Sequence, residues 1–328
     1  MTMKKFRWGL IGPGRIAENF AQALMVIDDA ELYAVASRNK QRAISFADKY
    51  SAKTTYQQYS ELVVDDKIDA VYISTPHSFH YEQIKLCLEA GKAVLCEKPL
   101  TVNAAQSQEL MNLAKAQGVF LMEAVWTRFL PIYGRVKTWL DSGIIGEVKS
   151  LDSNFGFCVP RDLDDRMYNH DLAGGVLLDM GIYNVTISQW VYGENPQSIQ
   201  ASALLTETDV DEHTAVNMSY SNGRHSQFTC SFLVKHRNDF CIYGTKGHIK
   251  IHDMFWCTSD ATLVTETENL TISDPFRATG FEYEIEEAMS CIRAGLLESS
   301  IISHADTLAT MTVMDTIRSQ IGQKYRFE

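Results

Sequence analysis

The sequence predicts an α/β fold in which two domains of different architecture follow one another. Over residues 1–123, short apolar runs alternate with helix-length segments, as in a parallel sheet with right-handed helical crossovers. From residue 124 onward, several runs alternate between apolar and polar residues and are separated by turns that contain glycine. The 328 residues also exceed the length of one ordinary core. We therefore expect a parallel α/β domain over residues 1–123 and an α+β domain with a large, open and mostly antiparallel sheet over residues 124–328.

The composition argues against several classes of function. Hydrophobic residues make up 45% and charged residues 22% of the chain, which is typical of an ordered globular protein. The formal net charge of −11 repels phosphate backbones and disfavours nucleic acid as a partner. No apolar run approaches the roughly 20 residues of a membrane span, and the first residues lack the apolar stretch of a signal peptide. Seven cysteines without a Cys-x-x-Cys pair favour reduced thiols, so we expect a cytoplasmic protein without a zinc site.

A glycine-rich turn follows the first expected strand, residues 6–11. Residues 12–17 read Gly-Pro-Gly-Arg-Ile-Ala and lead into a helix that runs to about Val26. In a dinucleotide-binding fold, Gly12 makes the tight turn, Gly14 lets the backbone approach the pyrophosphate, and the helix N-terminus holds the phosphates. The alternative is an ordinary glycine-rich turn. The position between a strand and a helix favours the cofactor site.

The second strand, residues 31–36, ends without an acidic residue. In folds that bind NAD, an acidic side chain at this point holds the ribose hydroxyls. Here Ser37 and Arg38 follow instead, and a hydroxyl with a guanidinium suits a 2′-phosphate. We therefore expect NADP rather than NAD. The alternative is that Arg38 and Arg42 are surface residues of the next helix.

Two later strand ends supply further candidates for the cofactor crevice, because open α/β sheets bind ligands at the carboxyl ends of their strands. The strand over residues 69–74 ends at Thr75-Pro76-His77, and His80 follows shortly after. His77 and His80 are either ligand contacts or caps of the following helix, and the sequence leaves both open. The strand that ends at Glu97 and Lys98 is stopped by Pro99. Lys98 is either a solvated strand-end lysine or a cation of the active site.

The second half is expected to form one sheet with helices on one side. Alternating runs cover residues 148–157, 199–207, 215–220, 225–233, 239–243 and 248–252. Helix-length segments at residues 174–192, 282–293 and 305–321 are available to cover one face. The other face then needs a partner, and a homodimer through the sheet is the natural solution.

One segment of the second half carries an acid and a phenol at helical spacing. On a helix through residues 176–191, Asp179 and Tyr183 share a face. Such a pair can orient a substrate and exchange a proton, particularly where a nearby lysine stabilises the phenolate. The alternative for Tyr183 is a packing residue with a wetted hydroxyl. His248 and His252 have no acidic partner in sequence, so we expect no metal site there.

Four motifs together resemble the glucose–fructose oxidoreductase/inositol dehydrogenase (Gfo/Idh/MocA) family. They are residues 12–17, Thr75-Pro76-His77, Glu97-Lys98-Pro99-Leu100 and residues 174–183. Residues 96–99, 121–129 and 244–247 are similar to its dimeric dihydrodiol dehydrogenase and NADP-dependent D-xylose dehydrogenase branch. The resemblance covers essentially the whole chain in the right order.

This resemblance implies a Rossmann domain, a second domain on an open sheet that dimerises, and hydride transfer between NADP and a sugar or alcohol carbon. It implies Lys98 and Tyr183 as the proton-handling pair, Asp179 as an orienting residue, and a cis bond before Pro99. The expected cofactor contacts are Gly12, Gly14, Arg15, Ile16, Ser37, Arg38, Thr75, Pro76, His77, His80, Glu97 and Lys98. The expected substrate contacts are Trp126, Arg128, Phe155, Arg161, Asp179, Tyr183 and Trp256.

The expected function is a cytoplasmic NADP-dependent oxidoreductase. Its substrate would be an aldose such as D-xylose, or a trans-dihydrodiol or cyclic polyol, and no metal is expected to take part. The alternatives are a non-catalytic NADP-sensing regulator on the same scaffold and an enzyme that acts on an imine or a tetrapyrrole.

Overall fold

The computed structural model describes residues 5–328, which divide into two compact units. The first contains residues up to Trp126 together with Arg277–Thr307, and the second contains Thr127–Phe276 together with Leu308–Glu328. The crossing after Trp126 lies close to the expected boundary after residue 123. The return of residues 277–307 to the first unit was not expected. Over residues 5–328, no helix has the length and apolar character that a membrane crossing requires.

The first unit is built on a six-stranded parallel sheet with the strand order β3-β2-β1-β4-β5-β6. This is the order of a dinucleotide-binding Rossmann domain. The core strands are buried on both faces, as their continuous apolar sequences predict. Only the short edge strand β3 was absent from the expected set. The strands are β1 (Phe6–Ile11), β2 (Ala30–Ala36), β3 (Thr54–Tyr56), β4 (Ala70–Ile73), β5 (Ala93–Glu97) and β6 (Leu121–Ala124).

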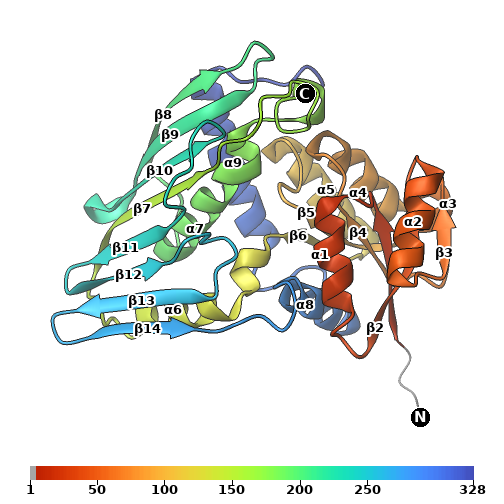
Figure 1. Ribbon diagram of the computed structural model, residues 1–328, viewed down its shortest axis with the longest axis horizontal. Coiled ribbons are helices and arrows are strands. Elements are labelled where there is room, and N and C mark those ends of the chain that lie inside the picture. Colours follow the sequence, from red (N-terminus) through yellow and green to blue (C-terminus); the bar gives the residue numbers. More distant parts are fainter. Residues whose placement is uncertain (1–4) are drawn as a thin grey trace. The chain divides into compact units, whose positions relative to one another are not determined.

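Two helices of this unit begin at an asparagine whose side chain caps the first turn. The side chains of Asn39 and Asn103 accept N–H groups of the first turns of α2 and α5, and Gly118 ends α5 at a φ of +65°. The helices of this unit connect successive strands of the sheet (Figure 1). They are α1 (Arg15–Leu24), α2 (Lys40–Tyr50), α3 (Tyr59–Val63), α4 (His80–Glu89) and α5 (Ala104–Gln117).

Helix α8 (Glu282–Arg293) belongs to this first unit, which corrects the expectation that it covers the second sheet. Thr279 Oγ1, just before the helix, donates to Asn19 O across 3.0 Å. Arg293 in its last turn pairs with Asp29 at 2.7 Å. The amphipathic pattern of the segment predicts a helix with one buried face, but the pattern carries no information about which sheet that face meets.

The second unit is built on an eight-stranded sheet with the order β14-β13-β12-β11-β7-β10-β9-β8. All neighbours are antiparallel except β7 and β10, so the expected large and mostly antiparallel sheet is confirmed. The last two strands were missed by sequence reasoning. The strands are β7 (Val148–Gly156), β8 (Ser198–Leu205), β9 (Asp211–Ser219), β10 (His225–Ser231), β11 (Phe240–Gly244), β12 (Gly247–Ile251), β13 (Asp260–Thr265) and β14 (Asn269–Ser273).

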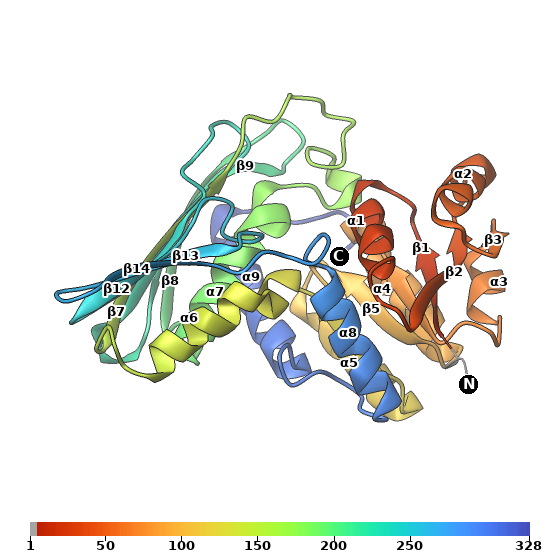
Figure 2. The same ribbon diagram turned by 60° about the horizontal axis from the view of Figure 1, so that its bottom comes forward.

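Helices lie on one face of this second sheet. Figure 2 shows α6 (Pro131–Asp141), α7 (Ile182–Tyr192) and α9 (His304–Ile321) on the same side of the strands. The strands alternate accordingly: on β10 Phe228 is buried and Gln227 is exposed, and on β9 Met218 is buried and Asn217 is exposed. The face that carries Gln227 and Asn217 has no covering helix among the described residues.

Candidate active site

The glycine turn after β1 has the geometry that its sequence predicts. Gly12 adopts a φ of +88°, and a Cβ atom there would lie 2.6 Å from Thr75 Cγ2. Its N–H donates to Ala36 O across 3.2 Å, and the N–H of Gly14 donates to Gly12 O across 2.8 Å. A Cβ atom on Gly14 would meet nothing closer than 3.9 Å. The turn therefore leaves open space beside the N-terminus of α1, which begins at Arg15 and offers backbone N–H groups to a phosphate.

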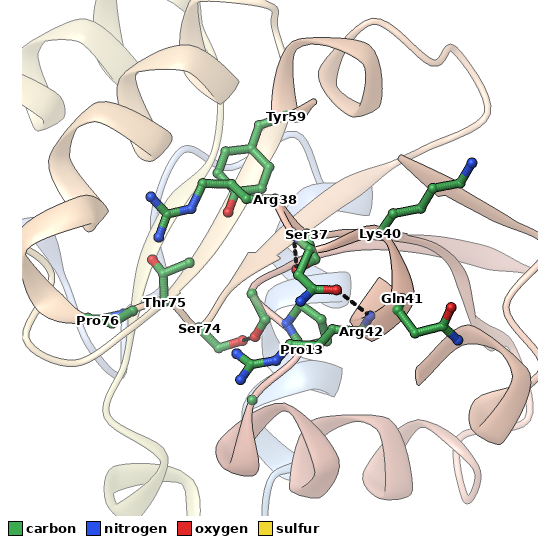
Figure 3. A pocket seen from close by; sticks show the side chains of 13 residues that line it. Pro13, Ser37, Arg38, Lys40, Gln41, Arg42, Tyr59, Ser74, Thr75 and Pro76 are labelled. Atoms are coloured by element: carbon green, nitrogen blue, oxygen red, sulfur yellow. Dashed lines mark hydrogen bonds between the residues drawn. The ribbon is translucent and has the colours of Figure 1, made fainter. Parts of the chain in front are cut away.

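A cavity of about 650 Å³ opens beside this turn. Figure 3 shows side chains that line it from the glycine turn, the end of β2, the start of α2 and the end of β4. Six of the expected cofactor contacts line it, namely Gly12, Gly14, Ser37, Arg38, Thr75 and Pro76. Seven lining residues were not among those contacts, namely Pro13, Asn39, Lys40, Gln41, Arg42, Tyr59 and Ser74. Tyr59 comes from a distant short helix, and no motif in the sequence connects it with the glycine turn.

The charge of the cavity lining is positive. Arg38, Lys40 and Arg42 contribute cations, and none of the 13 described lining residues is acidic. The guanidinium of Arg38 lies 4.9 Å from the ring centre of Phe79. The side chain of Lys40 extends away from the side chain of Arg38 (Figure 3). A guanidinium beside hydroxyl groups is a good receptor for a phosphate. The cavity thus fits a dinucleotide, and its charge suits an added phosphate on the adenosine ribose.

His80 connects the two strand ends on which the site depends. It is fully buried, with Nε2 at 2.9 Å from Thr75 O and Nδ1 at 2.8 Å from Pro99 O. Burial lowers the pKa of His80, while its two carbonyl partners oppose the fall and the charge of Lys98 adds to it. Each ring nitrogen thus lies within hydrogen-bond distance of a backbone carbonyl oxygen, and the neutral ring, which has one N–H group, donates to one of the two. This engagement favours a positioning role over direct contact with the cofactor. His77, on the short 3₁₀ helix His77–Phe79, is also buried, with its ring centre 5.8 Å from that of His80.

Lys98 directly follows β5, and the Lys98–Pro99 peptide bond is cis, as the family resemblance implies. The next residue is also held, because Leu100 N–H donates to Glu123 Oε1 across 2.9 Å and Thr307 Oγ1 donates to Glu123 Oε2 across 2.8 Å. Burial raises the pKa of Glu123, while the two hydrogen bonds and the nearby charge of Lys98 oppose the rise. The strand end that carries Lys98 is thus fixed from the sides of α4 and β6.

Glu97 lies in the interior of the first unit. Its side chain is buried, and Oε1 accepts the hydroxyl of Tyr72 across 2.5 Å. The structure brings Glu97 against Tyr72, a contact that sequence reasoning missed.

In the second unit, a tight turn sets the start of the segment that carries Asp179 and Tyr183. Gly175 has a φ of +122°, and a Cβ atom there would lie 2.3 Å from Asp211 Oδ1. The buried Asp211 accepts the N–H of Leu177 across 2.8 Å, and Tyr325 Oη donates to Gly174 O across 2.5 Å. Burial raises the pKa of Asp211 against these hydrogen bonds. A single π-helical turn, Leu177–Gly181, then leads into α7.

Tyr183 lies within an aromatic cluster of the second unit. Its ring centre is 5.9 Å from that of Phe155, and Phe155 is stacked on Trp256 with centres 3.5 Å apart and planes 8° apart. All three residues are buried. The structure thus brings together three of the expected substrate contacts. Asp179 accepts a hydrogen bond from Arg166 Nη1 across 3.1 Å, and sequence reasoning had not included this arginine.

The remaining expected substrate contacts make other interactions. Arg161 pairs with Glu207 and also lies 3.5 Å from the buried Glu212. The guanidinium of Arg128 lies 5.4 Å from the ring centre of Trp190. Trp126 belongs to the first unit, where its ring centre is 4.6 Å from that of Phe281. Among residues 5–328, no three histidine, cysteine or acidic side chains come together as a metal site would require.

Two family models match the chain. Residues 6–125 match the oxidoreductase family model with an NAD-binding Rossmann fold, and residues 133–250 match the C-terminal domain model of the same Gfo/Idh/MocA group. The chain belongs to the Gfo/Idh/MocA oxidoreductase family.

Curated relatives in this family share the whole length of the chain. A trans-1,2-dihydrobenzene-1,2-diol dehydrogenase of Danio rerio is 37% identical over 97% of this chain and 98% of its own length. The human enzyme of that name is 34% identical over 96% of this chain and 97% of its own. The protein is therefore an NAD(P)-dependent dehydrogenase of the Gfo/Idh/MocA family.

Solved structures of the family have the same architecture. KijD10, a 3-ketoreductase from Actinomadura kijaniata in complex with NADP and TDP-benzene, is 26% identical with a TM-score of 0.88 and covers 97% of this chain and 98% of its own. Levoglucosan dehydrogenase, in complex with NADH and levoglucosan, has a TM-score of 0.86 at 20% identity, with coverage of 97% of this chain and 98% of its own. One of these structures contains NADP and the other NADH, so the fold alone does not fix the choice of cofactor.

Proposed function

We propose that this dehydrogenase transfers hydride between NADP and a hydroxyl-bearing ring carbon of a trans-dihydrodiol, a cyclic polyol or an aldose such as D-xylose. The observation that carries the proposal is the position of Tyr183 beside the stacked pair of Phe155 and Trp256. Flat aromatic faces pack against the C–H face of a ring, while a phenol can reach its hydroxyl. The full-length identity to dihydrodiol dehydrogenases supports the same class of substrate.

In the proposed reaction, the substrate C–H bond breaks and hydride passes to the nicotinamide carbon C4, while the hydroxyl proton passes to Tyr183. The products are a carbonyl compound, NADPH and a proton. Lys98 is proposed to stabilise the phenolate and to hold the nicotinamide ribose, an assignment that rests on the sequence resemblance. Asp179, hydrogen-bonded to Arg166, would orient the substrate. The bound cofactor supplies the hydride chemistry, and the protein supplies orientation and proton transfer.

The proposed preference for NADP rests on the basic cavity beside the glycine turn. Arg38→Ala is expected to raise the KM for NADP by roughly 10-fold to 100-fold and to leave the KM for NAD unchanged, since a charged hydrogen bond to a phosphate is worth about 1.5–3 kcal/mol. Lys115→Ala, on the exposed face of α5, is the matched control. A lower KM for NAD than for NADP in the unmodified protein would overturn this preference.

The substrate class is tested by absorbance at the reduced-nicotinamide band. The protein would be incubated with NADP, or with NAD in parallel, and with a panel of trans-cyclohexadiene diols, inositols and aldoses. Reduction of NADP by one ring class supports the proposal and selects the substrate. Tight NADP binding in calorimetry, with no turnover across the panel, would contradict it.

We also propose that the protein is a cytoplasmic homodimer that pairs through the helix-free face of the second sheet. This face carries Tyr243, which is 40% exposed, and Leu204, which is 51% exposed. All seven cysteines are free thiols, as suits a reducing compartment. Sedimentation at twice the chain mass of 37.0 kDa is expected, with Tyr243→Arg shifting the protein toward the monomer. A monomer at all concentrations would contradict the dimer.

A further inference from the structure

The segment that follows α9, residues 322–328, returns to the Gly174–Gly175 turn of the second unit. The side chains of Gln323 and Tyr325 on this segment are buried. Tyr325 Oη donates to Gly174 O across 2.5 Å, a bond that joins residues 151 positions apart. Burial, followed by the charge of Asp211, raises the pKa of Tyr325 well above its usual range, so the hydroxyl keeps the proton that it donates.

Gln323 engages the same turn through the buried Asp211. Its Nε2 donates to Asp211 Oδ1 across 3.1 Å and to Tyr325 Oη across 3.3 Å. The other oxygen of Asp211 accepts the N–H of Leu177 across 2.8 Å. A Cβ atom on Gly175 would lie 2.9 Å from Gln323 Nε2, so the turn and the segment pack closely. The two side chains therefore hold the turn at a carbonyl oxygen and, through Asp211, at an N–H group that follows it.

The 322–328 segment is itself anchored to α9. The buried guanidinium of Arg318, in the last turn of that helix, pairs with both carboxylate oxygens of Glu328 and lies 4.7 Å from the ring centre of Tyr325. Glu328 also accepts the N–H of Tyr325 across 3.0 Å. His170 Nε2 lies 3.0 Å from Lys324 O. A bidentate pair of arginine and carboxylate has a fixed geometry, so the ring of Tyr325 has a defined place against the turn.

The turn is connected to Tyr183 by continuous helical structure. The N–H of Asp179 donates to Gly175 O across 3.2 Å, and the π-helical turn Leu177–Gly181 passes directly into α7, which carries Tyr183. Hydrogen bonds link successive turns of a helix, so a shift of its first residues is passed on to the side chains that follow. A misplacement of about 1 Å at a reacting group can lower a rate by about 100-fold.

We propose that Tyr325 is a positioning residue for Tyr183: by holding Gly174 O, with Gln323 holding Asp211, it fixes the turn from which the Tyr183 helix starts. This inference rests on the proposed role of Tyr183 in proton transfer. Tyr325 takes no part in the chemistry and acts only through the backbone of the turn.

Tyr325→Phe tests the role because it removes Oη and keeps the ring. It is expected to lower kcat by about 10-fold to 100-fold and to leave the KM for NADP unchanged. Tyr192→Phe is the matched control, since Tyr192 Oη also donates to a backbone carbonyl of the second unit, His225 O at 2.7 Å, but from the last residue of α7. Its kcat should stay within about threefold of the unmodified value. Equal kcat in the two variants would overturn the role.

Two comparisons separate positioning from a general loss of stability. Each variant loses one hydrogen bond, so both melting temperatures should fall by a similar amount, about 2–4 °C. In a Tyr183→Phe background, adding Tyr325→Phe should lower kcat by less than about threefold, because the phenol that it positions is already absent. A further fall as large as in the unmodified protein would overturn the role, since Tyr325 would then act independently of Tyr183.

Amide hydrogen exchange followed by mass spectrometry tests the positioning without any measurement of activity. Peptides that cover residues 174–183 should exchange about tenfold faster in Tyr325→Phe and at an unchanged rate in Tyr192→Phe. Unchanged exchange in Tyr325→Phe would overturn the inference. Failure of the proposed function is distinguishable: near-normal turnover in Tyr183→Phe would refute the role of Tyr183, and the exchange rates would still decide whether Tyr325 holds the turn.

Discussion

The two residues proposed to handle the proton are held in different ways. Lys98 extends from the end of a parallel strand, and its position is set by buried polar contacts to backbone: His80 to Pro99 O, and Glu123 to the N–H of Leu100. Tyr183 sits on a helix whose start is set by the Gly174–Gly175 turn and the buried Asp211. The ring of Tyr183 lies beside that of Phe155, which is stacked on Trp256. In the first unit, hydrogen bonds to backbone groups thus position Lys98. In the second unit, ring packing and a tight turn position Tyr183.

This difference has a physical consequence for how each position tolerates change. Hydrogen bonds to buried backbone are directional, and a lost partner leaves a buried polar group that costs about 1–3 kcal/mol. Packing of rings is less directional, so a smaller side chain can be accommodated by a shift of neighbours. We therefore expect substitutions near Lys98 to act on turnover and stability together, and substitutions near Tyr183 to act mainly on substrate binding.

The largest expected effect joins the two regions. Lys98→Met and Tyr183→Phe are each expected to lower kcat by about 10³-fold, within the range for loss of a general acid–base group. Because both act on one proton, the double variant should be little worse than either single variant. Steady-state kinetics and calorimetric NADP binding measure this, and binding should be retained in Tyr183→Phe. Near-normal turnover in both single variants would contradict the assignment.

The next effect concerns the His80 clamp of the first unit, by which we mean the contacts of the His80 ring with the carbonyl oxygens of Thr75 and Pro99. His80→Leu removes the ring N–H that donates to a buried carbonyl oxygen and is expected to lower the free energy of unfolding by about 1–3 kcal/mol, with a fall of about tenfold in kcat. Urea unfolding followed by tryptophan fluorescence measures the first quantity. Lys115→Leu, at an exposed position of α5, is the control and should change little. An equal change in the two variants would mean that the clamp contributes nothing.

A smaller effect is expected from the aromatic stack of the second unit. Trp256→Leu removes the partner of Phe155 and should raise the KM for the ring substrate by about tenfold, which corresponds to roughly 1.4 kcal/mol, with little change in the KM for NADP. Trp139→Leu, a half-buried position on α6, is the control. A rise in the NADP KM alone would place Trp256 outside the substrate site.

The smallest effect is a pH dependence of the clamp. The folded-state pKa of His80 lies below its ordinary value of 6.5, mainly because of burial. A group with a lowered pKa contributes stability that is present above the unfolded-state value and is lost as pH falls through the folded-state value. Between the unmodified protein and His80→Gln, the difference in unfolding free energy should shrink below pH 6.5 by at most about 1.4 kcal/mol per pH unit. A difference that is constant from pH 7 to pH 5 would contradict the buried neutral state.

Much of the first unit could be predicted because its signals are local. The turn at Gly12 and Gly14 needs residues without a Cβ atom, so the glycines are visible in the sequence, and buried parallel strands read as continuous apolar runs. The residue types at the end of β2 predict a phosphate site, and Ser37 and Arg38 do line the cavity beside the turn. The choice at His80 between ligand contact and cap was open, since it depends on Pro99, which lies 19 residues away.

The second unit was less predictable because its decisive contacts are distant in sequence. Phe155 and Trp256 are separated by about a hundred positions, and each looks like an ordinary core residue until the sheet brings them into a stack. Strand β14 has alternating polar and apolar residues, but it is only five residues long and mostly exposed, and sequence reasoning missed it. The ion pair of Asp179 with Arg166 likewise joins a helix to a preceding loop of irregular structure.

The sequence by itself determined the order of elements, the glycine turn, the basic residues beside it, and the strand end that carries Lys98. These features follow from local steric constraints and from the spacing of apolar residues, and both can be read from the sequence alone. Only the tertiary structure decided that α8 packs in the first unit and that Glu97 accepts the hydroxyl of Tyr72 in its interior. An amphipathic pattern predicts that one face of a helix is buried. The residues that face meets, and hence the charge that a buried carboxyl can carry, depend on residues that only folding brings together.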